Sequence, residues 1–222
     1  MMSSMAVLFC DNVTNRVEIH MAFDLDRLER YCSKVISRFA QQHHQERFYR
    51  FAIDEDLLCL NSVEAHDETA VRYQLAWQES VRPLVSWEEV QADPESQRLI
   101  GLLERYQGLD TGDHAACLQA INDERAQKRQ EQPVNPYSTP EGLLSLRENT
   151  GDWKYQGFAT LTDCDGFNWE AVVDHQELDP QSQPHSEYAV AMTQLLARLV
   201  ESGIFQELNV TEDFSAIRVE HD

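Results

Sequence analysis

Apolar side chains recur along this chain at helical and at strand-like spacings, so the pattern predicts both kinds of element. Spacings of three and four residues place side chains on one face of a helix. The clearest such face covers 186–202 and ends at Gly203, because a residue without a side chain suits a helix C-terminus. Another follows Asp24, where either Asp24 or the pair Asp26 and Glu29 would cap the helix.

Two more helices are expected where a capping residue precedes a proline, at Asp93-Pro94 and at Thr139-Pro140. The stretch 67–81 alternates partly like a strand, but its length and flanks favour a helix. The expected helices therefore cover about 24–39, 67–81, 93–106, 113–130, 138–148 and 186–202.

Alternating aromatic and branched residues predict strands. Strands at 48–53 and 57–63 would form a hairpin around a short acidic turn. Strands at 153–161 and 167–173 would form a second hairpin, because an Asp-Gly pair at 165–166 is a strong hairpin signal. Further strands are expected as a pair within 5–23 and as a short strand at 216–219.

These clusters lack the regular alternation of strand and helix that builds a parallel sheet. They favour the α+β class, with a mostly antiparallel sheet built from hairpins and packed against several amphipathic helices. A length of 222 residues favours one domain over 1–222. The polar stretch 131–138, which contains Pro133 and Pro136, is the best candidate for a soft boundary.

The charge of the chain limits the kinds of partner that it can bind. Its 39 acidic and 18 basic side chains give a net charge of −21, which argues against direct nucleic-acid binding because phosphate contacts need clustered Lys and Arg. The start of the chain has no basic residue before Arg16, and no stretch is long and apolar enough for a membrane span. Five scattered cysteines without a C-x-x-C pair suggest mostly buried thiols. Together these features predict a cytoplasmic protein.

Recognisable catalytic motifs are missing from the sequence. No histidine pair has metal-ligand spacing, no glycine-rich phosphate loop occurs, and no nucleophile elbow is present. Asp163 to Gly166 resembles the start of a calcium loop but lacks the later ligands. We therefore expect no metal and no cofactor. Catalytic groups could still converge from distant positions, with His114 or His175 among them.

Acidic charge is concentrated in the last third of the chain. From Glu148 onward 15 acids face 3 bases, and no Lys or Arg lies between Lys154 and Arg198. One interpretation is protection against self-association. The other is a contact surface for a cationic protein, whose candidate residues are Asp163, Asp165, Glu170, Asp174, Glu177, Asp179 and Trp169. The aromatic residues of this stretch are Trp153, Tyr155, Phe167, Trp169 and Tyr188. About half of these five should point into the core, because strand side chains alternate.

Four short segments resemble a bacterial family known as a domain of unknown function, number 4303 in its series. They are Phe48–Ala52, Asn149–Gln156, Thr211–Phe214 and Arg218–His221, spread over most of 24–222. The resemblance implies a cytoplasmic α+β domain, often encoded beside polymorphic or contact-dependent toxins whose small acidic companions act as immunity factors. It supplies no catalytic residues.

The leading hypothesis from the sequence is a non-enzymatic immunity or inhibitor-type module that neutralises a basic protein, such as a toxin, through the stretch 153–187. The alternative is a hydrolase-type enzyme with a convergent Asp/Glu/His site. A third hypothesis is a nucleic-acid mimic with acids at phosphate-like spacing along one face.

Overall fold

A computed structural model describes residues 23–219; the strand pair expected within 5–23 falls on residues outside this range, apart from Phe23. The strands are β1 (Phe48–Asp54), β2 (Leu57–Ser62), β3 (Tyr155–Thr160) and β4 (Val210–Arg218). The helices are α1 (Leu25–Gln42), α2 (Val63–Val81), α3 (Trp87–Ala92), α4 (Pro94–Gln107), α5 (His114–Glu131), α6 (Pro140–Glu148), α7 (Trp169–Glu177) and α8 (Glu187–Ser202).

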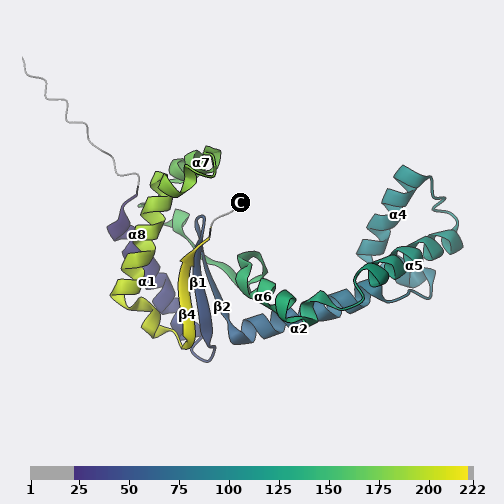
Figure 1. Ribbon diagram of the computed structural model, residues 1–222, viewed down its shortest axis with the longest axis horizontal. Coiled ribbons are helices and arrows are strands. Elements are labelled where there is room, and N and C mark those ends of the chain that lie inside the picture. Colours follow the sequence, from purple (N-terminus) through teal and green to yellow (C-terminus); the bar gives the residue numbers. More distant parts are fainter. Residues whose placement is uncertain (1–22, 220–222) are drawn as a thin grey trace, which may run out of the picture.

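The four strands form one mixed sheet in the order β3-β2-β1-β4 (Figure 1). The pairs β1–β2 and β2–β3 are antiparallel, whereas β1 and β4 are parallel. Parallel pairing requires a crossover connection; here α8 leads to β4 through a short 3-10 helix at Ile204–Glu207. The α+β class is confirmed, as is the first hairpin, but the sheet is not purely antiparallel.

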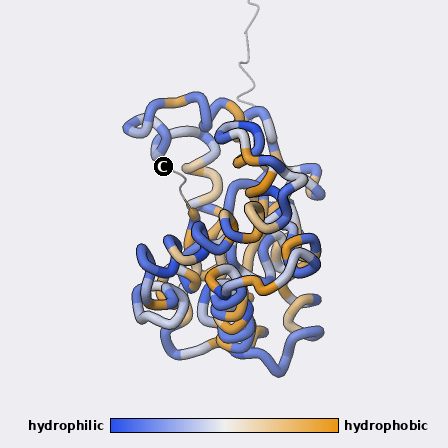
Figure 2. The backbone as a smooth tube through the Cα atoms, turned by 90° about the vertical axis from the view of Figure 1, so that its right-hand side faces the viewer, coloured by the Kyte–Doolittle hydropathy of each residue, from blue (hydrophilic) through white to orange (hydrophobic). Residues whose placement is uncertain are grey.

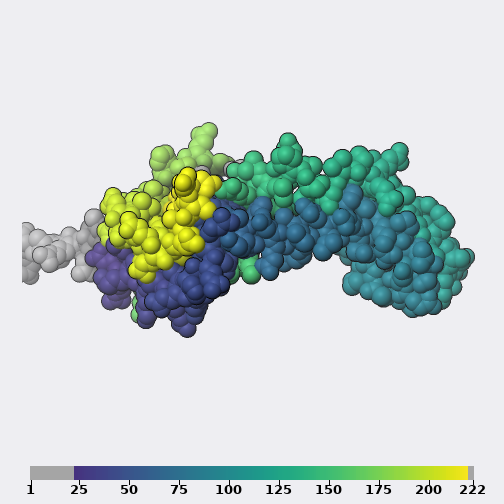
Figure 3. Space-filling model, turned by 90° about the horizontal axis from the view of Figure 1, so that it is seen from below, coloured from purple at the N-terminus to yellow at the C-terminus, as the bar shows by residue number. Residues whose placement is uncertain are grey.

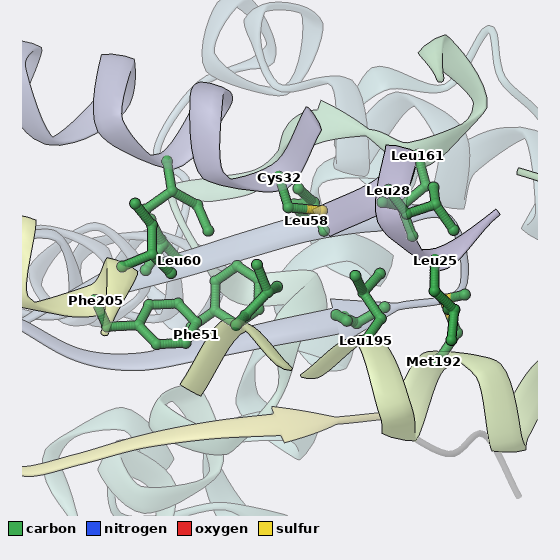
Figure 4. Packing of buried hydrophobic residues seen from close by; sticks show 14 of the residues in the cluster. Leu25, Leu28, Cys32, Phe51, Leu58, Leu60, Leu161, Met192, Leu195 and Phe205 are labelled. Carbon is green, nitrogen blue, oxygen red and sulfur yellow. The ribbon is translucent and has the colours of Figure 1, made fainter. Parts of the chain in front are cut away.

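Helices α1 and α8 cover one face of the sheet, and the main core lies between these helices and the sheet (Figure 4). Phe51 and Ile53 point into this core from β1. The expected apolar faces of both helices are confirmed, since Leu28, Cys32, Ile36, Phe39, Ala189, Met192, Leu195 and Leu199 are buried. Val200, near the end of α8, is 54% exposed.

The opposite face of the sheet is covered by the segment that follows α6. Ala52, which alternates with Phe51 and Ile53, packs there with Cys59 and Trp153. The Trp153 indole donates to the carbonyl oxygen of Arg147, so the end of α6 is fixed to the sheet. Cys32, Cys59 and Cys117 are buried free thiols, as expected, and Cys164 is half-buried.

The remaining helices extend away from the sheet, so the molecule is elongated (Figures 1 and 3). We call α1, α7, α8 and the sheet the body, and α3, α4, α5 with the end of α2 the distal lobe. The distal lobe has a small core of its own, formed by Leu84, Val90, Ile100, Cys117 and Ile121. Helix α2 leads out to it, and the chain returns through residues 132–139 and α6, which contact α2.

Apolar residues are distributed differently in the two parts. In the body the buried apolar residues form one large core, and in the distal lobe a smaller one; along the backbone, hydrophilic and hydrophobic residues follow one another closely (Figure 2). Helix α2 leaves Val71 and Leu75 more than half exposed, because only residues 132–139 and α6 run beside its middle.

The prediction of a second hairpin is wrong for its second strand. Residues 153–161 contain β3, but 167–173 mostly belong to helix α7. The apolar residues of this segment alternate, yet Ala171 and Val172 are the ones buried, and the side chain of Asn168 accepts a hydrogen bond from the Glu170 amide as a helix cap. β3 pairs with β2 instead.

Candidate interaction surface

All seven residues proposed for partner contact are exposed, and they lie on α7 or in the loops on either side of it. Glu170, Asp174 and Glu177 belong to the helix, as does Trp169. Asp163 and Asp165 precede it, and Asp179 follows it. Because residues 169–177 form a helix, a short helix presents these groups where a hairpin was expected.

Local contacts fix how α7 sits on the body. Gly166 is buried against the start of α1, and its carbonyl oxygen accepts a hydrogen bond from the Asp24 amide at 2.9 Å. A Cβ at Gly166 would lie 2.9 Å from the Asp24 carbonyl oxygen, so this close approach favours glycine. At the other end, His175 Nδ1 lies 2.8 Å from the Ser186 hydroxyl, at the first turn of α8.

With its inner side fixed in this way, α7 turns Trp169, Glu170, Val173, Asp174 and Glu177 outward. The helix projects from the body in the space-filling view (Figure 3). Asp179 accepts hydrogen bonds from the Ser182 hydroxyl and from the Gln181 amide, which lower the pKa of its carboxyl group.

The turn between β1 and β2 brings further acids close to α7. The sequence placed these acids in the first hairpin, apart from the segment that contains α7. The Tyr188 hydroxyl donates to the Glu55 carbonyl oxygen, and the Gln176 amide donates to the Glu55 carboxylate at 2.9 Å. The Asp56 carboxylate accepts from the Thr160 hydroxyl just before the 161–166 loop. The acidic triplet at 54–56 was visible in the sequence, but its position beside α7 follows from the fold alone.

The acids around α7 lack the basic partners that several other acids of the body have. Asp26 and Glu29 of α1, by contrast, both pair with Arg198, at 2.7 and 3.5 Å. In the described part of the chain no ion pair involves Asp163, Asp165, Glu170, Asp174, Glu177 or Asp179. We call these six residues together with Trp169 the α7 surface; its negative charge is open to a partner.

Of the five aromatic residues within 153–188 named from the sequence, only Trp169 is exposed, at 46%. Trp153 and Tyr188 are buried, and Tyr155 and Phe167 are half-buried. Burial raises the pKa of Tyr188 despite the nearby Arg218, so its hydroxyl stays neutral. About half of the five were expected to point inward; two are buried and two are half-buried.

A second cluster of polar side chains lies where β1 begins. The Glu46 carboxylate accepts hydrogen bonds from the Ser62 hydroxyl at 2.6 Å and from Tyr155, and His43 Nδ1 lies 3.0 Å away. Burial opposes ionisation of Glu46, but these hydrogen bonds outweigh it and lower its pKa. Ser62 is fully buried and caps α2, so this cluster ties elements together and offers no accessible nucleophile.

The residues considered for an enzyme are not brought together. His114 stacks on Trp87 in the distal lobe, with ring centres 4.2 Å apart, while His175 bonds to Ser186 in the body. Within residues 23–219 no group of three or more His, Cys, Asp or Glu side chains is arranged to hold a metal ion. A hollow of about 710 Å³ lies between α2 and α3–α5, and neither histidine lines it.

Comparison with protein-family models, with curated proteins and with solved structures finds no match to this chain. The resemblance to the family of unknown function therefore stays a prediction from the four short segments. Across residues 23–219, no helix has the length and apolar character that crossing a membrane requires.

Proposed function

We propose that this chain is a non-enzymatic binding protein of the immunity or inhibitor type, which acts in the cytoplasm and neutralises a basic protein by covering part of it with the α7 surface. The observation that carries the proposal is the set of six exposed carboxylates without ion pairs in the described chain. Unpaired like charges repel one another and cost stability, while they speed the approach of a cationic partner.

The position of the acids adds support. They lie on a projecting helix and its adjoining loops, where a partner can reach them without rearrangement of the core. Glu55 and Asp56 extend the negative potential toward the sheet. The resemblance to a family often encoded beside toxins points to the same class of protein.

The proposal predicts that charge on the α7 surface controls the rate of association. A partner captured from the native host at low salt would be identified, purified and tested against a triple variant, Asp163→Lys, Asp165→Lys and Glu170→Lys. We expect association about ten-fold slower or more, with a weaker dependence on salt, because electrostatic steering acts on the association rate. Stopped-flow mixing at several salt concentrations measures both quantities.

The control carries the same charge change in the distal lobe, at the exposed acids Glu104, Asp123 and Glu131. Its association rate should stay close to that of the original protein. Equal slowing in both triple variants would reduce the effect to net charge and remove the assigned surface. A captured partner that is not basic would contradict the proposed class of partner.

A further inference from the structure

Helix α7 carries an exposed apolar pair alongside its acids. Trp169 is 46% exposed and Val173 is 39% exposed. Residues four apart are neighbours on a helix surface, so the two side chains form one short apolar ridge. The packing of α7 on the body uses Ala171 and Val172 on the inner side, so packing among residues 23–219 does not account for this ridge.

The Trp169 indole packs against aromatic residues of the body. Its ring centre lies 6.4 Å from that of Phe167, which in turn meets Phe23 edge-to-face at 5.5 Å. The inner half of the indole therefore rests on the body while the outer half faces solvent. An aromatic side chain held in place loses little conformational entropy on binding, and such residues dominate many protein interfaces.

Acidic side chains border the ridge on the same exposed face. Glu170, Asp174 and Glu177 follow one another at spacings of four and three residues, which places them in a row beside Trp169 and Val173. None of the three has a basic partner in the part of the chain that the structure describes. An apolar ridge bordered by open carboxylates is complementary to an apolar strip bordered by Lys or Arg.

We propose that the α7 surface binds a basic amphipathic segment of a partner protein, with the apolar side of that segment on Trp169 and Val173 and its Lys or Arg side chains over Glu170, Asp174 and Glu177. This inference rests on the proposed function and specifies its partner. Charge selects this occupant: the same carboxylates would repel an anionic membrane surface and the acidic surface of a second copy of this chain.

The apolar ridge and the row of acids then have separate roles. Carboxylates steer the partner and set the association rate, whereas a desolvated aromatic anchor sets how long the complex lasts. Trp169 is therefore the residue that distinguishes an amphipathic basic segment from a basic segment that lacks an apolar side.

The test uses two synthetic helical peptides of about 14 residues, four turns, with the same number of lysines. One carries Leu at helical spacing and the other carries Ser at the same positions. The original protein should bind the Leu peptide about ten-fold more tightly than the Ser peptide, which corresponds to about 1.4 kcal/mol. Trp169→Ala should reduce this preference to near unity, and Trp169→Phe should retain most of it. Calorimetry or fluorescence anisotropy measures each affinity.

Tyr106→Ala is the matched control, because Tyr106 is an aromatic residue 75% exposed on α4 of the distal lobe; it should leave both affinities unchanged. Thermal unfolding of each variant checks the fold. Val173→Ser replaces Trp169→Ala if the latter unfolds, and it should also reduce the preference for Leu.

The possible failures are distinguishable. If both peptides bind equally and Trp169→Ala changes neither affinity, while Glu170→Gln with Asp174→Asn weakens both, the apolar anchor is wrong and the acidic binding surface stands. If neither peptide binds, or the charge variants bind as the original protein does, the proposed function is wrong together with the inference. A Leu preference that survives both Trp169→Ala and Val173→Ser places the contact elsewhere and overturns the inference.

Discussion

At the scale of single residues, the structure separates acids that hold the fold together from acids that are open to solvent. Glu46 is the clearest of the first kind, since it joins Ser62 at the start of α2 to Tyr155 at the start of β3. Asp174 is of the second kind, exposed and without a basic partner in the described chain. Both are ordinary carboxylates in the sequence, and only their surroundings distinguish them.

Glu46→Gln should lower the free energy of unfolding at neutral pH by about 1–2 kcal/mol, because it weakens charge-assisted hydrogen bonds. The folded state lowers the pKa of Glu46, so its contribution is complete above the ordinary glutamate value of about 4.3 and is lost as the pH falls through the lower folded value. Urea unfolding of both proteins from pH 7 down to pH 3 measures this. The difference between them should shrink at acidic pH.

The control for this prediction is Glu207→Gln, at an exposed glutamate of the body, which should change stability little at any pH. A stability difference for Glu46→Gln that stays constant from pH 7 to pH 3 would contradict the assigned role of the ionised carboxylate.

At the scale of elements, close backbone approaches decide how helices join the body. Gly142 in the first turn of α6 is an example, because a Cβ there would overlap the carbonyl oxygen of Pro136. The chain turns tightly at this point before α6 packs beside α2. Gly101 in α4 meets no neighbouring atom within 4 Å of its Cβ position, so it has no such role.

These two glycines predict opposite effects of the same substitution. Gly142→Ala should destabilise the protein by about 1–3 kcal/mol, since the backbone must shift to relieve the overlap. Gly101→Ala should stabilise it by about 0.5–1 kcal/mol, because glycine inside a helix is less favourable than alanine. Thermal unfolding followed by circular dichroism measures both, and a stabilising Gly142→Ala would refute the close approach.

At the scale of the whole molecule, the body and the distal lobe have separate cores. Arg125 is central to the distal lobe and is only 11% exposed. Its guanidinium donates to the carbonyl oxygens of Glu79 and Arg82 at the end of α2, and to Asp93, the cap of α4, at 2.6 Å. One side chain thus joins α5 to both α2 and α4.

Arg125→Met should destabilise the distal lobe by about 2 kcal/mol, because it leaves the Asp93 carboxylate and two carbonyl groups without this donor. Hydrogen exchange should speed up in peptides from 83–131 and stay unchanged in those from α1, β1 and β2. Arg98→Met, which removes an exposed pair with Glu95 at 3.8 Å, should change neither region. Equal acceleration in the body would mean that the two parts unfold as one unit.

The sequence by itself determined most of the helices and the first hairpin. Capping residues such as Asp93 and Thr139, a helix-ending Gly203, and apolar spacing within α1 and α8 are local signals, and local interactions are sufficient to set them. Asp24, one of two caps left open by the sequence, is the one used. Exposure of the acids near α7 was also predictable, since unpaired carboxylates are costly to bury.

Tertiary structure decided what local signals left open. The segment 167–173 alternates like a strand, yet burial of Ala171 and Val172 and capping by Asn168 make it helical. The parallel position of β4 depends on where α8 crosses the sheet, and the closeness of Glu55 to α7 depends on pairing over more than 100 residues. Such contacts join distant parts of the chain, so their energies depend on packing that no short stretch of sequence contains.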